Sequence, residues 1–170
     1  MTTIPTGERA DLLETLATHR AFLRHTVRGL TREQLSQRTT VSELCLGGLI
    51  KHVTAVERQW TGFISRGAEA LGGFDEAGMT AHARQFQIEP GDTPEALLGE
   101  YDAVASTTAE LIGGLPDLDA SHALPEAPWF RPGARWSARR ALLHILAETS
   151  QHAGHADIIR EALDGQKTMG

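Results

Sequence analysis

The chain of 170 residues carries a formal net charge of −6, and 22 % of its residues are charged. This length suits one domain with a substantial core, and the composition excludes disordered and fibrous proteins. The basic residues are scattered along the chain, which excludes the basic patch that nucleic-acid binding requires. We therefore expect a single domain over residues 1–170 that has no nucleic-acid partner.

Nothing in the sequence indicates a membrane or secretory protein. No apolar run reaches the roughly 20 residues that cross a bilayer, and the first ten residues lack the apolar core of a signal peptide. The single cysteine, Cys45, cannot form an internal disulfide, which is typical of a reducing compartment. These features predict a cytoplasmic protein that does not bind membranes.

Four long helices follow from helical spacing of apolar residues and from their end signals, over about residues 8–30, 46–65, 93–112 and 137–163. Thr93 and Ser137 are suitable N-caps, and Gly165 follows the last helix. A capped turn is expected where Thr31 precedes Gln34, and a short helix near residues 76–86. Residues 116–136 form a long loop, and no strand is predicted. The pattern predicts an all-α four-helix bundle with two long connections, a fold that commonly holds metals between facing helices.

The last helix carries a polar stripe on the side that it is expected to bury. Measured from His144 at about 100° per residue, Glu148 lies near 40°, His152 near 80° and His155 near 20°. The same sector holds Ala141, Ile145, Ile158, Ile159 and Ala162, and the opposite, solvated sector holds Arg139, Asp157, Arg160 and Asp164. A carboxylate buried among imidazoles needs compensation, and a divalent metal ion provides it.

The second long helix offers a third ligand. His52 shares its face with Val56 and Trp60, so it is expected to point into the bundle. His52, Glu148 and His152 together make a two-imidazole, one-carboxylate set that suits zinc and is compatible with nickel or iron. Three protein ligands leave positions open for water or substrate, which is typical of a catalytic site.

Each of these histidines also has a plainer interpretation as a hydrogen-bonded core residue. His144 is open to three roles: ligand, outer hydrogen-bond partner of a ligand, which we favour, or buried structural residue. His155 is similar and also suits the wall of a substrate cavity. The remaining polar candidates are interpreted as core, cap or surface: His19 as core or cavity lining, Cys45 as a buried thiol or cap, and His25, His82 and His122 as surface residues.

Two segments together resemble the DinB-like metalloprotein superfamily, most of all its actinobacterial branch of mycothiol-dependent enzymes. The segments are Cys45-Leu-Gly-Gly-Leu-Ile-Lys-His52-Val-x3-Glu57-x2-Trp60 and Arg135-Trp-Ser-Ala-Arg139-x4-His144-x3-Glu148-x3-His152-Ala-Gly-His155-Ala-Asp157. The resemblance implies a four-helix bundle in which His52 and His152 match family ligands. Glu148 stands where many members have histidine, as in mycothiol-dependent maleylpyruvate isomerase. Ala153-Gly154-His155 replaces the Arg-Gly-Gln of much of the wider family.

By this resemblance the implied activity is a divalent-metal-dependent thiol S-transfer of the detoxification type, or a thiol-assisted isomerisation. Mycothiol or a similar low-molecular-weight thiol would be activated as a metal-bound thiolate and would attack an electrophilic small molecule. His155 or His144 would accept the proton, and Arg135 and Arg139 would pair with anionic groups of the thiol or substrate.

Three other readings stay open at this point. Metal-bound water in place of the thiolate would make the protein a hydrolase. A closed coordination shell would make it a non-enzymatic metal-binding stress protein, and a metal-free site would leave a bundle with a polar core. A bundle of this size is also compatible with a homodimer.

Overall fold

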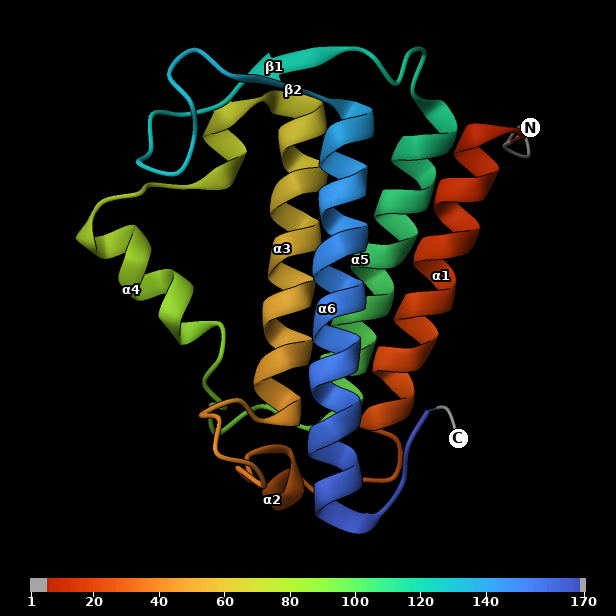
Figure 1. The fold of residues 1–170 in the computed structure, drawn as a ribbon, viewed down its shortest axis with the longest axis vertical. Coiled ribbons are helices and arrows are strands. Elements are labelled where there is room, and N and C mark those ends of the chain that lie inside the picture. The colour runs from red at the N-terminus through yellow and green to blue at the C-terminus, as the bar shows by residue number, and fades with distance from the viewer. Residues whose placement is uncertain (1–5, 169–170) are drawn as a thin grey trace.

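Six α-helices, one 3-10 helix and two short strands make up residues 6–168, the part of the chain that the computed structural model describes (Figure 1). In chain order they are α1 (Glu8–Thr26), α2 (Arg32–Leu35), α3 (Leu46–Arg66), η1 (Ala68–Leu71), α4 (Glu76–Arg84), α5 (Pro94–Gly114), β1 (Ser121–Ala123), β2 (Arg135–Ser137) and α6 (Ala138–Asp164).

The helices α1, α3, α5 and α6 run side by side along the long axis of the molecule, and α4 stands outside them next to α3 (Figure 1). The segment with η1 and α4 joins α3 to α5, and the segment with β1 and β2 joins α5 to α6. The prediction of an all-α four-helix bundle with two long connections is therefore confirmed.

The predicted helix ends are formed by the capping groups that the sequence offers. The Thr31 side chain accepts a hydrogen bond from the backbone N–H of Gln34, whose own side chain accepts one from the Thr31 N–H, a complete capping box. Ser137 caps α6 by accepting from the Arg140 N–H. Gly165, at φ 79°, ends α6 in the left-handed conformation that favours glycine.

Two local predictions were wrong. The first helix ends at Thr26 instead of near Leu30, although Leu30 is buried in the turn that follows. Gly29 at φ 72° turns the chain there. Two strands form where none was predicted: β1 pairs antiparallel with β2, with His122 opposite Trp136. Strands of three residues are too short to produce a recognisable alternation in the sequence.

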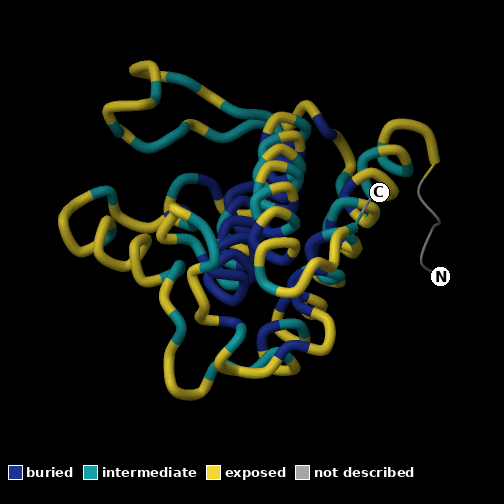
Figure 2. Tube along the Cα trace, turned by 60° about the horizontal axis from the view of Figure 1, so that its bottom comes forward, coloured by how far each residue is buried: buried dark blue, intermediate teal, exposed yellow. Residues whose placement is uncertain are grey.

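Apolar side chains fill the bundle in two layers, with a buried polar layer between them. Figure 2 shows the buried residues gathered along the long helices, while α4 and the loops are mostly exposed. The layers are defined by two clusters, one with Leu23, Leu46, Leu49, Val53, Tyr101, Ala153 and Ile159 among its members, the other with Leu16, Trp60, Phe63, Ile112, Ala141 and Ile145.

The polar layer between these clusters joins three helices. Arg20 of α1 donates from Nε to Glu57 Oε2 of α3 at 3.1 Å and makes a second bond to Oε1. Thr108 of α5 donates to the same Oε1 at 2.6 Å. The Glu57 side chain is fully buried, so these donors replace the water that it loses on folding.

The exposure predicted for the far end of α6 was wrong. Arg160, expected in the solvated sector, is 2 % exposed and donates to the carbonyl oxygens of Thr26 at 2.8 Å and Arg28 at 3.0 Å. These carbonyls lie where α1 ends and have no partner within that helix, so the guanidinium satisfies them. Because the end of α1 covers this side of α6, Ile158 and Ala162 on the other side are exposed.

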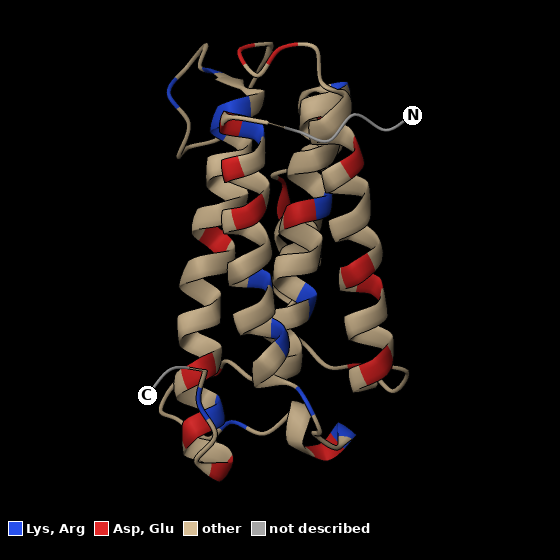
Figure 3. Cartoon of the chain, turned by 90° about the vertical axis from the view of Figure 1, so that its right-hand side faces the viewer, with Lys and Arg blue, Asp and Glu red and all other residues tan. Residues whose placement is uncertain are grey.

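Figure 3 shows acidic residues on each of the long helices and fewer basic ones, and α5 carries Glu95, Glu100, Asp102 and Glu110 but no lysine or arginine. Within residues 6–168, none of the helices has both the length and the apolar character that crossing a membrane requires.

Candidate metal centre

Three predicted ligands come together where α3 and α6 face each other. Glu148 Oε2 of α6 lies 3.5 Å from Nε2 of His52 on α3 and 3.5 Å from Nε2 of His152, one turn further along α6. One ligand atom from each residue lies within 4.8 Å of the other two. His52 is buried, and Glu148 and His152 are partly buried.

The donor set fits a divalent metal ion. Donor atoms bound about 2.0–2.1 Å from a tetrahedral ion lie roughly 3.3–3.4 Å apart, close to the two separations found here. Hydrogen bonding from His152 and then His52 holds the pKa of the Glu148 carboxyl far below its usual range, although burial opposes this shift. The centre therefore presents one carboxylate and two imidazole nitrogens, the ligand types that zinc, nickel and iron accept.

The ring of His52 is held on several sides by the last turn of α4 and the residues that follow it. Phe86 stacks on it with 4.1 Å between ring centroids and 22° between ring planes. Gln85 places its Oε1 3.2 Å from His52 Nδ1. The His82 ring meets it edge-on at 5.4 Å. His52 is thus oriented from outside the four-helix bundle.

Glycines at the start of α3 let this segment approach closely. A Cβ added at Gly48 would lie 2.3 Å from the carbonyl oxygen of Phe86, and one at Gly47 would lie 2.4 Å from Cδ1 of Ile88. Lys51, one turn further along α3, donates to the Gln87 carbonyl at 2.8 Å and pairs with Asp92. The glycine pair therefore permits the segment from 86 to 88 to pack closely against α3.

A cavity of about 590 Å³ opens next to the three ligands. It lies between α3, α6, the η1–α4 region and the loop that precedes β2. The lining residues are His52, Val56, Gln59, Trp60, Leu71, Gly72, Gly73, Phe74, Gly78, Met79, Ala81, His82, Gln85, Trp129, Phe130, Trp136, His144 and Glu148. A molecule in this cavity therefore reaches both Glu148 and His52.

The two histidines predicted as proton acceptors occupy different positions. His144 lines the cavity, with Nε2 3.9 Å from Glu148 Oε1 and its ring edge-on to Trp60 and Trp136. Burial lowers the pKa of His144, against the attraction of the Glu148 carboxylate. His155 does not line the cavity; its Nδ1 lies 3.4 Å from Nδ1 of His152.

The two arginines predicted to bind anions already have protein partners. Arg135 on β2 donates to the Ser121 carbonyl at 2.6 Å. Arg139, near the start of α6, pairs with both Glu8 and Asp119. Neither arginine is among the residues that line the cavity.

Two of the histidines predicted to lie at the surface make contacts that the sequence did not predict, although His82 is exposed as expected. His82 stays largely exposed but lines the cavity beside His52. His122 is partly buried, with Nε2 3.2 Å from the Ile64 carbonyl oxygen. Gln85 was not among the predicted site residues, and its only signal in the sequence was its place near the end of a short predicted helix. Cys45 is buried at the N-cap of α3 and makes no side-chain capping bond, as the buried-thiol interpretation expects.

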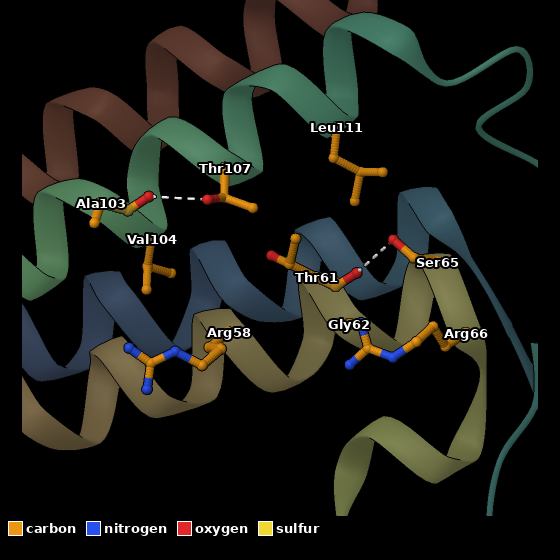
Figure 4. Close-up of a pocket in the computed structure, with 9 residues that line it drawn as sticks. All are labelled: Arg58, Thr61, Gly62, Ser65, Arg66, Ala103, Val104, Thr107 and Leu111. Atoms are coloured by element: carbon orange, nitrogen blue, oxygen red, sulfur yellow. Dashed lines mark hydrogen bonds between the residues drawn. The ribbon is translucent and has the colours of Figure 1, made fainter.

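A second hollow of about 400 Å³ lies between α3 and α5, and it shares no lining residue with the first (Figure 4). Its hydroxyls are engaged, since Ser65 donates to the Thr61 carbonyl and Thr107 to the Ala103 carbonyl. Arg58, at its side, pairs with Glu100 at 2.6 Å. Among the described residues, the group of candidate metal ligands borders the cavity beside Glu148 and not this second hollow.

Fold and site together define a DinB-like helical bundle with a two-histidine, one-carboxylate cluster. The family model described as mycothiol-S-transferase matches residues 11–165. This chain belongs to the mycothiol-S-transferase family, which confirms the resemblance drawn from its two motifs.

A solved structure shows the same fold. The crystal structure of a conserved protein from Enterococcus faecalis superimposes with a TM-score of 0.66 and 14 % sequence identity. The alignment covers 95 % of this chain and 100 % of that one. At this identity the likeness concerns the fold alone. A search of the curated proteins finds no match.

Proposed function

We propose that this protein is a divalent-metal-dependent thiol S-transferase that uses mycothiol or a similar low-molecular-weight thiol. The observation that carries the proposal is the cluster of His52, Glu148 and His152, of which His52 and Glu148 line a large cavity, within a chain of the mycothiol-S-transferase family. Zinc is the metal that we expect, because two imidazoles and one carboxylate with open positions are typical of catalytic zinc. The lone cysteine supports a cytoplasmic setting.

The proposed reaction joins the thiol sulfur to an electrophilic carbon. A divalent ion held by the three ligands would supply Lewis-acid activation, which lowers the pKa of a thiol. The new S–C bond forms as the leaving group departs with its electron pair, and the thiol proton is released. His144 is the residue that we assign to accept this proton at Nε2, because it lines the cavity and its lowered pKa keeps it neutral near pH 7.

The other predicted residues take supporting roles in this proposal. His155 holds His152 through the contact between their Nδ1 atoms, which fixes the ring that offers Nε2 to the centre. Arg135 and Arg139 lie at the end of the bundle where α6 begins, and thiol binding there would require them to exchange Ser121, Glu8 or Asp119 for the thiol.

Elemental analysis tests the metal centre first. We expect about one metal ion per chain in the wild type and its loss in His52→Ala, Glu148→Ala and His152→Ala. Arg58→Ala, at the second hollow, is the matched control and should keep the metal. A wild type that stays metal-free after reconstitution would overturn the proposal.

A turnover assay with and without thiol then tests the reaction. Thiol-dependent consumption of an electrophile, lost on chelation and restored by metal, supports the transferase. Consumption that is equally fast without thiol would instead indicate metal-bound water as the nucleophile and a hydrolase.

A further inference from the structure

Five tryptophan and phenylalanine rings contribute to the wall of the cavity beside Glu148. Trp60 of α3 stacks on Trp136 of β2, with 4.6 Å between centroids and 21° between planes. Phe130 meets Trp136 edge-on at 5.8 Å, and Phe74 meets Trp129 edge-on at 5.3 Å. All three tryptophans of the chain therefore line this one cavity.

Cationic side chains are absent from this wall. Among the described residues that line the cavity, none is lysine or arginine, and Glu148 is the one acidic residue. Arg140 lies over the Trp136 ring at 4.3 Å from its centroid but does not line the cavity. In the metal-free protein, an anionic group entering the cavity would lose water beside Glu148 without gaining a lysine or arginine as ion-pair partner.

Two apolar side chains of the cavity lining are largely exposed. Trp129 is 60 % exposed and Met79 is 63 % exposed, so both stand at the edge of the cavity with part of their apolar surface unburied. Ring faces and edges at this edge offer the offset-stacked and edge-to-face contacts that aromatic ligands prefer. A thioether at Met79 adds a soft apolar contact.

We propose that the electrophile taken by this site is an uncharged, flat aromatic molecule and that carboxylated aromatics are discriminated against. That this ligand is an electrophile rests on the proposed transferase function. The ligand class itself rests on the cavity wall alone. A neutral aryl halide illustrates the reaction: the thiolate sulfur bonds to the ring carbon, the carbon–halogen bond breaks, halide leaves with the electron pair, and the thiol proton is released.

Binding without metal or thiol gives the first test. The probes are 1,3-dinitrobenzene, which is neutral, and 3-nitrobenzoate, which has nearly the same shape and a negative charge. Titrations are followed by NMR at the indole N–H signals of the three tryptophans. We expect the neutral probe to bind at least about tenfold more tightly. Equal or tighter binding of 3-nitrobenzoate would overturn the proposal.

Two variants locate the binding and its charge preference. Trp129→Ala removes a largely exposed ring, so it should lower the affinity for the neutral probe severalfold while the fold persists. Ile158→Ala, an exposed apolar residue of α6 that does not line the cavity, is the matched control and should leave binding unchanged. Met79→Arg places a cation at the edge of the cavity and should improve binding of 3-nitrobenzoate. Failure of both cavity variants to alter binding would contradict the assignment.

Turnover measurements distinguish a failure of this proposal from a failure of the proposed transferase function. The substrates are 1-chloro-2,4-dinitrobenzene and 4-chloro-3-nitrobenzoate, each rate divided by its uncatalysed rate with the same thiol. A normalised kcat/KM at least about tenfold higher for the neutral substrate supports the proposal, and the reverse order overturns it. Selective binding without thiol-dependent turnover of either substrate would refute the transferase and keep the assigned ligand class.

Discussion

Gln85 accepts a hydrogen bond from His52: its Oε1 lies 3.2 Å from the His52 Nδ1 atom. An amide oxygen only accepts, so this contact requires a proton on Nδ1 and leaves Nε2 as the nitrogen that can offer its lone pair to a metal ion. That Nε2 faces Glu148 Oε2 at 3.5 Å. A residue outside the bundle therefore selects the tautomer that a metal ligand needs.

Replacing Gln85 should weaken metal binding. Gln85→Leu keeps the size of the side chain and removes the acceptor, so we expect metal affinity to fall about 10- to 100-fold, as for other partners that orient metal ligands. Competition with a chromophoric chelator measures this change. Gln87→Leu, two residues away and exposed, is the control. Gln85→Glu keeps an acceptor and should retain affinity; a Gln85→Leu variant with wild-type affinity would contradict the role.

Gly48→Ala should displace the segment that holds His52. The added Cβ would lie 2.3 Å from the backbone oxygen of Phe86, which cannot rotate away as a side chain does. We expect the free energy of unfolding to fall by about 1–3 kcal/mol, as for other overpacked sites, together with a loss of metal affinity. Gly99→Ala lies on α5 with open space around it, so its free energy of unfolding in denaturant titrations should rise by about 0.5–1 kcal/mol. Equal stability of the two variants would show that the segment around Phe86 moves away from α3 without cost.

Breaking the buried pair of Arg20 and Glu57 should destabilise the fold while sparing the metal centre. Glu57→Ala leaves a buried guanidinium without its partner, so the free energy of unfolding should fall by about 3–5 kcal/mol. Glu100→Ala removes the exposed partner of Arg58 and should cost at most about 1 kcal/mol. Urea unfolding measures both. A loss below about 1 kcal/mol for Glu57→Ala would show that water reaches the polar layer.

Metal removal should lower the melting temperature. An ion present at 100 times its dissociation constant stabilises the folded state by about 2.7 kcal/mol, or about 5–10 °C in a chain of this size. Scanning calorimetry with zinc and with chelator should show this difference in the wild type. In His152→Ala the two curves should coincide; a shift that persists there would place the stabilising metal elsewhere.

Much of the architecture was predictable because helix signals are local. Thr31, Ser137 and Gly165 act within one turn of their own position, so neighbouring residues suffice to place the helix ends. The spacing of His144, Glu148 and His152 likewise follows from 3.6 residues per turn. The side of α6 that is buried near its end was not predictable, because Arg160 donates to carbonyl groups at and just beyond the end of α1, which lie far away in the sequence.

The sequence by itself determined the four helices, their caps, and the faces that carry His52 on α3 and Glu148 with His152 on α6. The tertiary structure alone decided that these faces meet, that Gln85 and Phe86 close over His52, and that the aromatic loop residues surround one cavity. The physical reason is that periodicity and capping are properties of neighbouring residues. The path of a connection such as residues 72–88 depends instead on packing against distant ones, here the bare backbone of Gly48.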